Sequence, residues 1–95
     1  MNTEFASSPD GTRIAFDVTG QGPAIMLLHG GGHNRQKWHE VGYVERLHKD
    51  LIITIDIRGN GESDKPIDSA FYTTAKMCKD LLAVADAAPD PASVD

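Results

Sequence analysis

Two short apolar segments, each followed at once by a glycine-rich segment, constrain the fold of this chain more than any other feature. Residues 24–28 (AIMLL) are continuously apolar and lead into residues 29–32 (HGGG). Residues 51–57 (LIITIDI) are rich in β-branched side chains and lead into residues 58–61 (RGNG). Apolar runs of this length predict strands that are covered on both faces, as in parallel sheets. We therefore expect two covered strands, each ending in a turn.

The segment between these strands, residues 36–50, has a helical pattern in which apolar residues recur at every third position. The residues that carry this pattern are Trp38, Val41, Val44 and Leu47. Gly42 interrupts the pattern, so we expect a break or two short helices. A strand, a helical segment and a second strand in this order predict a parallel βαβ unit with a right-handed crossover.

The beginning of the chain predicts a β-hairpin. Residues 2–7 indicate a short strand, and residues 12–19 alternate between two faces. Residues 9–11 (PDG) between them predict a turn, because proline presets φ and glycine accepts the positive φ of a tight turn. We expect antiparallel pairing, with one buried face on the second strand. The side chains on that face are Ile14, Phe16 and Val18.

Residues 69–88 predict the clearest helix of the chain. Thr73 or Thr74 can cap its start, and Pro89 ends it because proline cannot continue the hydrogen-bond ladder. Residues 89–95 (PDPASVD) follow as a short acidic tail that we expect to be frayed. The stripe expected to face the core comprises Ala75, Cys78, Leu81, Leu82, Ala85 and Ala88, whereas Lys76, Lys79, Asp80 and Asp86 lie off it.

Composition narrows the classes of function. The chain has 95 residues, enough for one small domain, which we place at residues 1–88, with residues 89–95 as its tail. Fourteen acidic against nine basic side chains give a net charge of −5 without a basic stripe, so we expect no nucleic-acid partner. No apolar run is long enough to span a membrane, and no leader peptide is evident. Cys78 is the single cysteine, so we expect a reducing, cytoplasmic setting.

The first glycine-rich segment offers chemistry as well as a bend. Gly30, Gly31 and Gly32 follow His29 at the end of an apolar strand. Without side chains, such residues can turn sharply and leave their N–H groups facing a ligand, where they can stabilise a developing oxyanion. Taken alone, the segment is better explained by a glycine-rich turn that binds nothing.

The second glycine-rich segment follows the next strand. Residues 56–64 (DIRGNGESD) place Asp56 and Arg58 before two glycines. The two charged side chains can pair or bond to neighbouring backbone, and the glycines permit a sharp turn. Taken alone, this segment favours a structural turn at the carboxyl end of a strand.

Together, the two segments resemble a known family. The order strand–HGGG–helix–strand–DxRGxGxS, preceded by a hairpin, is similar to the N-terminal part of the α/β-hydrolase fold over about residues 3–88. The resemblance implies an α/β fold: an incomplete hydrolase sheet with an antiparallel hairpin, a parallel βαβ unit and a further helix. It also implies that the backbone amide of Gly31 is an oxyanion donor, with Gly32 as second candidate. The residues given a structural role are His29, Gly30, Asp56, Arg58, Gly59, Gly61 and Ser63.

The family's nucleophile has no counterpart in these residues. It lies in a G-x-S-x-G turn, and Ser63 follows Gly61 but lacks the second glycine. Cys78 lies on the apolar stripe, where we expect a small core residue. The resemblance therefore implies the front part of a hydrolase, without nucleophile, acid or histidine. The intact parent would cleave a small ester-like or related substrate by a nucleophile–His–acid mechanism, and the chain alone would be inactive.

Other kinds of site are less well supported. His29 and His33 bracket a glycine turn without a carboxylate cluster, so we expect no metal site. Residues 59–64 lack the third glycine of a dinucleotide fingerprint, and residues 30–37 lack the Gly-Lys-Ser/Thr of a phosphate-binding loop. We therefore expect no cofactor. His33 and Trp38 are candidates to line a substrate pocket, although Trp38 fits an ordinary core position equally well.

The resemblance also implies an exposed sheet edge. In this family the third strand is central and pairs with a strand that comes after the last helix found here. Without that strand, residues 24–28 would present an unpaired apolar edge, which favours self-association or pairing with a partner chain. Two functions therefore stay open: the front part of a hydrolase, or a non-catalytic α/β binding module or remnant that associates with a partner chain.

Overall fold

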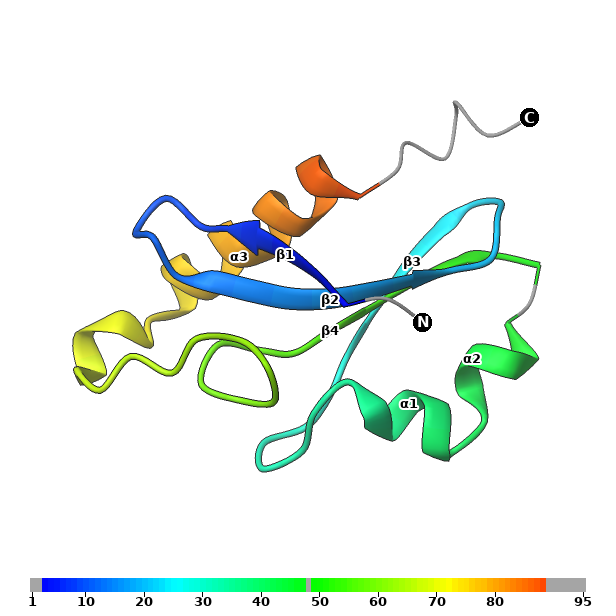
Figure 1. Cartoon of the computed structure of the whole chain (residues 1–95), viewed down its shortest axis with the longest axis horizontal. Helices are drawn as coiled ribbons and strands as arrows, with labels where there is room; N and C mark the ends of the chain where they lie inside the picture. The colour runs from blue at the N-terminus through cyan, green and yellow to red at the C-terminus, as the bar shows by residue number, and fades with distance from the viewer. Residues whose placement is uncertain (1–2, 48, 89–95) are drawn as a thin grey trace.

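A four-stranded mixed sheet with helices on both faces organises the chain (Figure 1). The computed structural model describes residues 3–47 and 49–88. The strands lie side by side in the order β1-β2-β4-β3, which confirms the predicted α/β class. In chain order the elements are β1 (Glu4–Ser7), β2 (Arg13–Thr19), β3 (Ala24–Leu28), α1 (Gln36–Glu40), α2 (Tyr43–Arg46), β4 (Leu51–Ile55), the 3-10 turn η1 (Ser69–Phe71) and α3 (Thr74–Ala87).

The predicted hairpin is confirmed, because β1 and β2 pair antiparallel. The Gly11 N–H closes the turn by donating to the Ser8 carbonyl at 2.8 Å, and Gly11 has a φ of +87°, which favours glycine. The prediction of one buried face on β2 is wrong, since Ala15 and Asp17 on the other face are buried as well. The reason is an ion pair: the buried Arg35 guanidinium covers that face at Asp17.

β3 and β4 form the predicted parallel pair, with Met26 opposite Ile53. Every residue of β4 is buried. β3 instead forms an edge of the described sheet, with its first and last residues, Ala24 and Leu28, exposed and the rest half-buried. The prediction that β3 is covered on both faces is therefore wrong, whereas the predicted apolar edge is confirmed. An edge strand leaves one row of backbone N–H and C=O groups without a strand partner.

Two short helices, α1 and α2, connect β3 to β4, as the position of Gly42 predicts. Gly42 lies between them with a φ of +82°, a conformation that interrupts an α-helix. These two helices lie on one face of the sheet, and α3 lies on the other (Figure 1). The strand–helix–strand unit therefore brings the segments that follow β3 and β4 to the same end of the sheet.

α3 begins later than predicted, because residues 69–71 form the separate turn η1. Of the two candidate caps, the structure selects Thr73, whose side-chain oxygen accepts a hydrogen bond from the Lys76 N–H at 3.2 Å. The helix ends at Ala87. The predicted stop at Pro89 and the predicted tail lie outside the described residues.

The buried face of α3 is rotated relative to the predicted stripe. Val84 is 0% exposed and Asp80 is buried, although the pattern placed Asp80 off the stripe. Asp80 faces inward because it is paired with the buried Arg58 guanidinium. The predicted core position of Cys78 is wrong, since this side chain is exposed. Of the predicted stripe, Leu81 and Ala88 pack against the core, whereas Ala75, Cys78, Leu82 and Ala85 are exposed.

The apolar core lies between the sheet and α3. Its buried side chains are Ala6, Ile14, Phe16, Ile53, Ile55 and Val84. Within the described residues, no helix has both the length and the apolar character needed to cross a membrane. Polar groups, by contrast, gather on the α1 face and at the carboxyl ends of β3 and β4.

Candidate functional site

Residues 30–34, here called the glycine loop, follow β3 and are all exposed. The His33 N–H donates to the Gly30 carbonyl at 3.2 Å and closes a turn. Gly32 has a φ of +78° and Gly31 has no positive φ, which matches a type II turn. The N–H groups of Gly31 and Gly32 have no hydrogen-bond partner among the described residues. The turn therefore holds two neighbouring donors that are free to bind a ligand.

His29 fixes the start of the glycine loop. The side chain is buried, and its Nδ1 donates to the Gly30 carbonyl at 2.7 Å. Its Nε2 accepts a hydrogen bond from the Ile57 N–H at 3.0 Å. Only the tautomer with the proton on Nδ1 satisfies both contacts. The imidazole thus ties the loop to the segment after β4.

Asp56 directly follows β4 and is fully buried. Its Oδ1 accepts a hydrogen bond from the Arg35 backbone N–H at 2.6 Å. Its Oδ2 accepts one from the Glu62 N–H at 2.8 Å and pairs with the Arg35 guanidinium. Gly61 has a φ of +53° and lies so close that a Cβ there would stand 2.3 Å from the Asp56 carboxyl carbon. The second motif therefore folds around this carboxylate.

Arg35 is the residue of this site that the sequence did not predict. Its side chain is 3% exposed, and its Nε donates to Asp17 at 3.0 Å. Its Nη2 donates to Glu62 at 2.8 Å and to the Thr3 hydroxyl at 2.6 Å. Burial alone would lower the pKa of Arg35, but the hydrogen bonds that Arg35 donates to Glu62 and Asp17 and the nearby Asp56 charge raise this pKa above its ordinary value. The guanidinium is therefore permanently charged.

Arg58 forms a second buried hub on the α3 side. Its Nε and Nη2 donate to the two Asp80 oxygens at 2.7 and 2.6 Å. Its Nη1 donates to Asp10 at 2.8 Å and to the Phe71 carbonyl at 2.6 Å. The hydrogen bond to Asp80, followed by that to Asp10, outweighs burial and raises the pKa of Arg58. The sequence left open whether Asp56 and Arg58 pair with each other or bond to neighbouring backbone. In the structure they do not pair with each other: Asp56 accepts from the Glu62 N–H and pairs with Arg35, and Arg58 donates to the Phe71 carbonyl and pairs with Asp80.

Ser63 and Gly59 of the second motif also make close contacts with neighbouring segments. Ser63 is buried, and its Oγ donates to the Asp56 carbonyl at 2.6 Å and accepts from the Ala15 N–H at 2.8 Å. Gly59 has a φ of +86°, and a Cβ there would lie 2.8 Å from the Tyr72 ring. Both positions therefore hold the motif in place.

His33 and Trp38 lie in different segments, the glycine loop and α1. His33 is exposed in the glycine loop, with its ring next to Gly30. Trp38 is half-buried in α1, and its ring centroid lies 5.2 Å from that of Tyr43. No group of three potential metal ligands comes together within residues 3–47 and 49–88. The lining of a substrate pocket by His33 and Trp38 stays a prediction.

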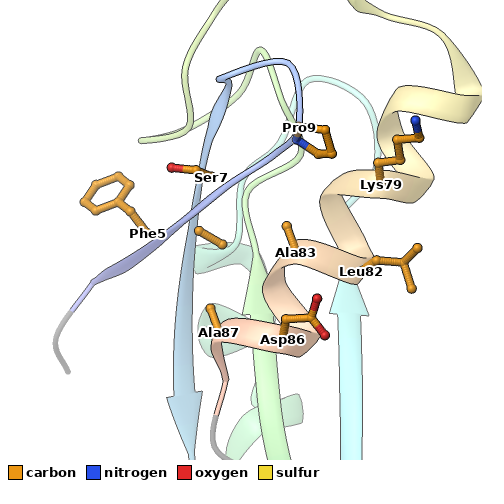
Figure 2. Close-up of a pocket in the computed structure, with 9 residues that line it drawn as sticks. Phe5, Ser7, Pro9, Lys79, Leu82, Ala83, Asp86 and Ala87 are labelled. Atoms are coloured by element: carbon orange, nitrogen blue, oxygen red, sulfur yellow. The ribbon is translucent and has the colours of Figure 1, made fainter.

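A depression of about 660 Å³ lies between β1 and α3, away from both motifs. Figure 2 shows Phe5 and Leu82 pointing away from each other, with Lys79 and Asp86 at separate positions along α3. Such a surface lacks the convergent polar groups of a ligand site. The smaller apolar cavity of about 110 Å³ under Leu28, next to Met77 and Leu81 of α3, also lacks them.

Comparison with known proteins decides the family. The profile of the family described as alpha/beta hydrolase fold matches residues 23–92. The chain belongs to this family. Among solved structures, it is similar to the bottromycin epimerase BotH in complex with bottromycin A2, with a TM-score of 0.85 and 28% identity. The match covers 92% of this chain and 35% of BotH, so the hydrolase sheet is incomplete here.

The curated relatives also match most of this chain but only a small part of their own length. An uncharacterised protein of Mycobacterium tuberculosis is 40% identical over 77 residues, covering 80% of this chain and 22% of the relative. Protein phosphatase methylesterase 1 of Bos taurus is 35% identical over 89 residues, covering 92% of this chain and 23% of the relative. The chain therefore spans about a fifth to a quarter of the length of these relatives.

Proposed function

We propose that this chain is the oxyanion-loop part of a hydrolase that cleaves a small carboxylic ester. The observation that carries the proposal is the pair of free N–H groups on Gly31 and Gly32, held in a closed turn at the carboxyl end of a parallel strand. Family membership and the methylesterase among the relatives support this class of reaction. The exposed single cysteine fits a reducing compartment, and we place the hydrolase in the cytoplasm.

The described residues supply no nucleophile–histidine pair. Ser63 is buried and uses its hydroxyl both as donor and as acceptor. Cys78 is exposed on α3. His29 uses both ring nitrogens to hold the glycine loop. The nucleophile, acid and histidine of the proposed hydrolase therefore come from residues other than these, and we expect the chain alone to be inactive.

The proposed role of the glycine loop is to bind negative charge. The histidine takes the proton of the nucleophile as the nucleophile attacks the ester carbonyl carbon, and the C=O electron pair moves to oxygen and forms an oxyanion. Two backbone donors at about 2.7–3.1 Å from that oxygen stabilise it. As the carbonyl re-forms, the alcohol leaves with a proton delivered by the histidine, and an acyl-enzyme remains. Water then repeats the attack and releases the acid, again through an oxyanion.

The second candidate function is a non-catalytic module that associates with a partner chain. The position of β3 at the edge of the described sheet favours it, because a strand of another chain can add there. The two functions differ in one respect. A hydrolase requires the free N–H of Gly31, whereas a binding module that uses the edge of β3 does not.

The test introduces two substitutions at Gly31, one at a time, into the polypeptide in the form in which its own cell makes it. Each variant is then purified. Gly31→Ala keeps the N–H, and its methyl group meets no atom within 4 Å. Gly31→Pro removes the N–H and suits the second position of a type II turn. With p-nitrophenyl acetate as substrate, we expect Gly31→Ala to retain activity and Gly31→Pro to lose about 100-fold or more in kcat. Equal activities of the two variants, or no esterase activity in the wild type, would contradict the proposal.

A further inference from the structure

The glycine loop is held at its two ends and free between them. At its start, the buried His29 accepts a hydrogen bond from the Ile57 N–H at 3.0 Å. At its end, the backbone N–H of the buried Arg35 donates to Asp56 at 2.6 Å. Asp56 and Ile57 are neighbours in the chain, so both ends are fixed to one point after β4. The five residues of the loop itself are exposed.

The Arg35 end of the loop carries the larger share of these contacts. Besides the backbone bond, its guanidinium pairs with Asp17 of β2, Asp56 after β4 and Glu62 of the second motif. It also donates to the Thr3 hydroxyl, just before β1. One side chain therefore joins the end of the glycine loop to β2, to the residue before β1 and to the second motif.

A role limited to stability does not explain this arrangement well. A buried ion pair gives little net stability, since removing charges from water offsets most of their attraction. The second buried arginine, Arg58, already ties the second motif to α3 through Asp80. What Arg35 adds is the connection from Asp56 to the loop that carries the free N–H groups. The planar guanidinium donates to three different carboxylates, Asp17, Asp56 and Glu62, and so also fixes direction, which a single point charge does not.

We propose that Arg35 is the positioning residue of the glycine loop: acting through Asp56, it fixes the orientation of the Gly31 and Gly32 N–H groups. This rests on the proposed function for its catalytic meaning, because those groups are the proposed oxyanion donors. The second motif then has a defined task. Gly61 leaves room for the Asp56 carboxylate, and that carboxylate orients the end of the loop through Arg35.

The test measures directly whether the turn of the glycine loop is formed. The His33 N–H closes the turn, so its hydrogen–deuterium exchange, read by residue-level mass spectrometry on the whole chain, reports whether the turn is formed. Dividing its protection by that of Ile53 in β4 removes the effect of global stability. Arg35→Lys keeps the charge and loses the fork. The matched control is Arg58→Lys, which changes an equally buried arginine that does not contact the loop.

We expect Arg35→Lys to lower the His33 protection relative to Ile53 by about tenfold, and Arg58→Lys to leave this ratio unchanged. Asp17→Asn, which weakens the hold on Arg35 without removing it, should lower the ratio in the same direction, and it decides the question if Arg35→Lys unfolds the sheet. An unchanged ratio in the deciding variant, or an equal drop in Arg58→Lys, overturns the proposal. The readout needs no catalysis, so its failure is distinct from a failure of the proposed esterase activity.

Discussion

Arg58 and Asp80 form a two-point ion pair between the second motif and α3, with N···O distances of 2.7 and 2.6 Å. Both side chains are buried, at 0% and 5% exposure. The pair explains why α3 turns a carboxylate toward the sheet and an apolar side chain, Leu82, toward solvent. It makes the geometry of the second motif dependent on a helix that begins ten residues after the motif ends.

Removing one partner of the Arg58–Asp80 pair should destabilise the fold. We predict that Arg58→Met lowers the free energy of unfolding by about 3–5 kcal/mol, because it leaves the Asp80 carboxylate buried without its partner. The double variant Arg58→Met/Asp80→Leu should recover part of that loss, since no buried charge then remains at Asp80. Urea denaturation measures both. A double variant no more stable than the single one would contradict this explanation.

Asp10 should give the chain a measurable acid dependence. The hydrogen bond from Arg58 holds the pKa of Asp10 well below its ordinary value. Because the folded-state pKa is the lower one, the stabilisation is present above the unfolded value of about 3.9 and is lost as the pH falls through the folded value. We predict that Asp10→Asn is less stable than wild type at neutral pH and that this difference shrinks below about pH 4. The exposed Asp86, changed to Asn, is the control and should show no such trend in urea titrations.

Gly61 should tolerate no side chain. Its φ is +53°, and a Cβ would stand 2.3 Å from the Asp56 carboxyl carbon. We predict that Gly61→Ala destabilises the fold by about 3 kcal/mol or more, because backbone strain and displacement of Asp56 add together. Gly11 provides the matched control: it has a φ of +87° but open space around its Cβ position, so Gly11→Ala should cost only about 1 kcal/mol. Thermal or urea unfolding measures both variants. An equal loss of stability in Gly61→Ala and Gly11→Ala would contradict a role for the contact with Asp56.

The edge of β3 should make the isolated chain associate. We predict a sedimentation coefficient that rises with concentration, because the edge presents unpaired backbone groups next to the exposed Leu28. Leu28→Lys should weaken this association, since a charge on an edge strand opposes pairing. Leu82→Lys adds the same charge on α3, where the side chain is 65% exposed, and should leave association unchanged. A monomer at all concentrations would rule out the edge as an interface.

The sequence predicted the framework because local patterns determine it. The apolar runs of β3 and β4, the turn before β2 and the interruption at Gly42 each have a cause within a few residues. The inward face of α3 was mispredicted for the opposite reason. Asp80 is buried through a partner 22 residues away in sequence, and hydrophobic periodicity carries no information about such a pair.

The candidate site was predictable only in part. The two motifs identified the glycines, His29 and Asp56, but not Arg35. A single arginine at the start of a short helix has no distinguishing sequence signal, and its burial arises from carboxylates on β2, directly after β4 and in the second motif.

The measurement that tests the central claim most directly is the intact mass, by top-down mass spectrometry, of the polypeptide that carries these residues in its own cell. If residues 3–88 are the oxyanion-loop part of a hydrolase, the mass should lie well above 10.3 kDa. The fragment ions should then continue into a segment with a nucleophile between glycines. A mass of 10.3 kDa, with no partner chain that supplies a nucleophile and a histidine, would contradict the claim.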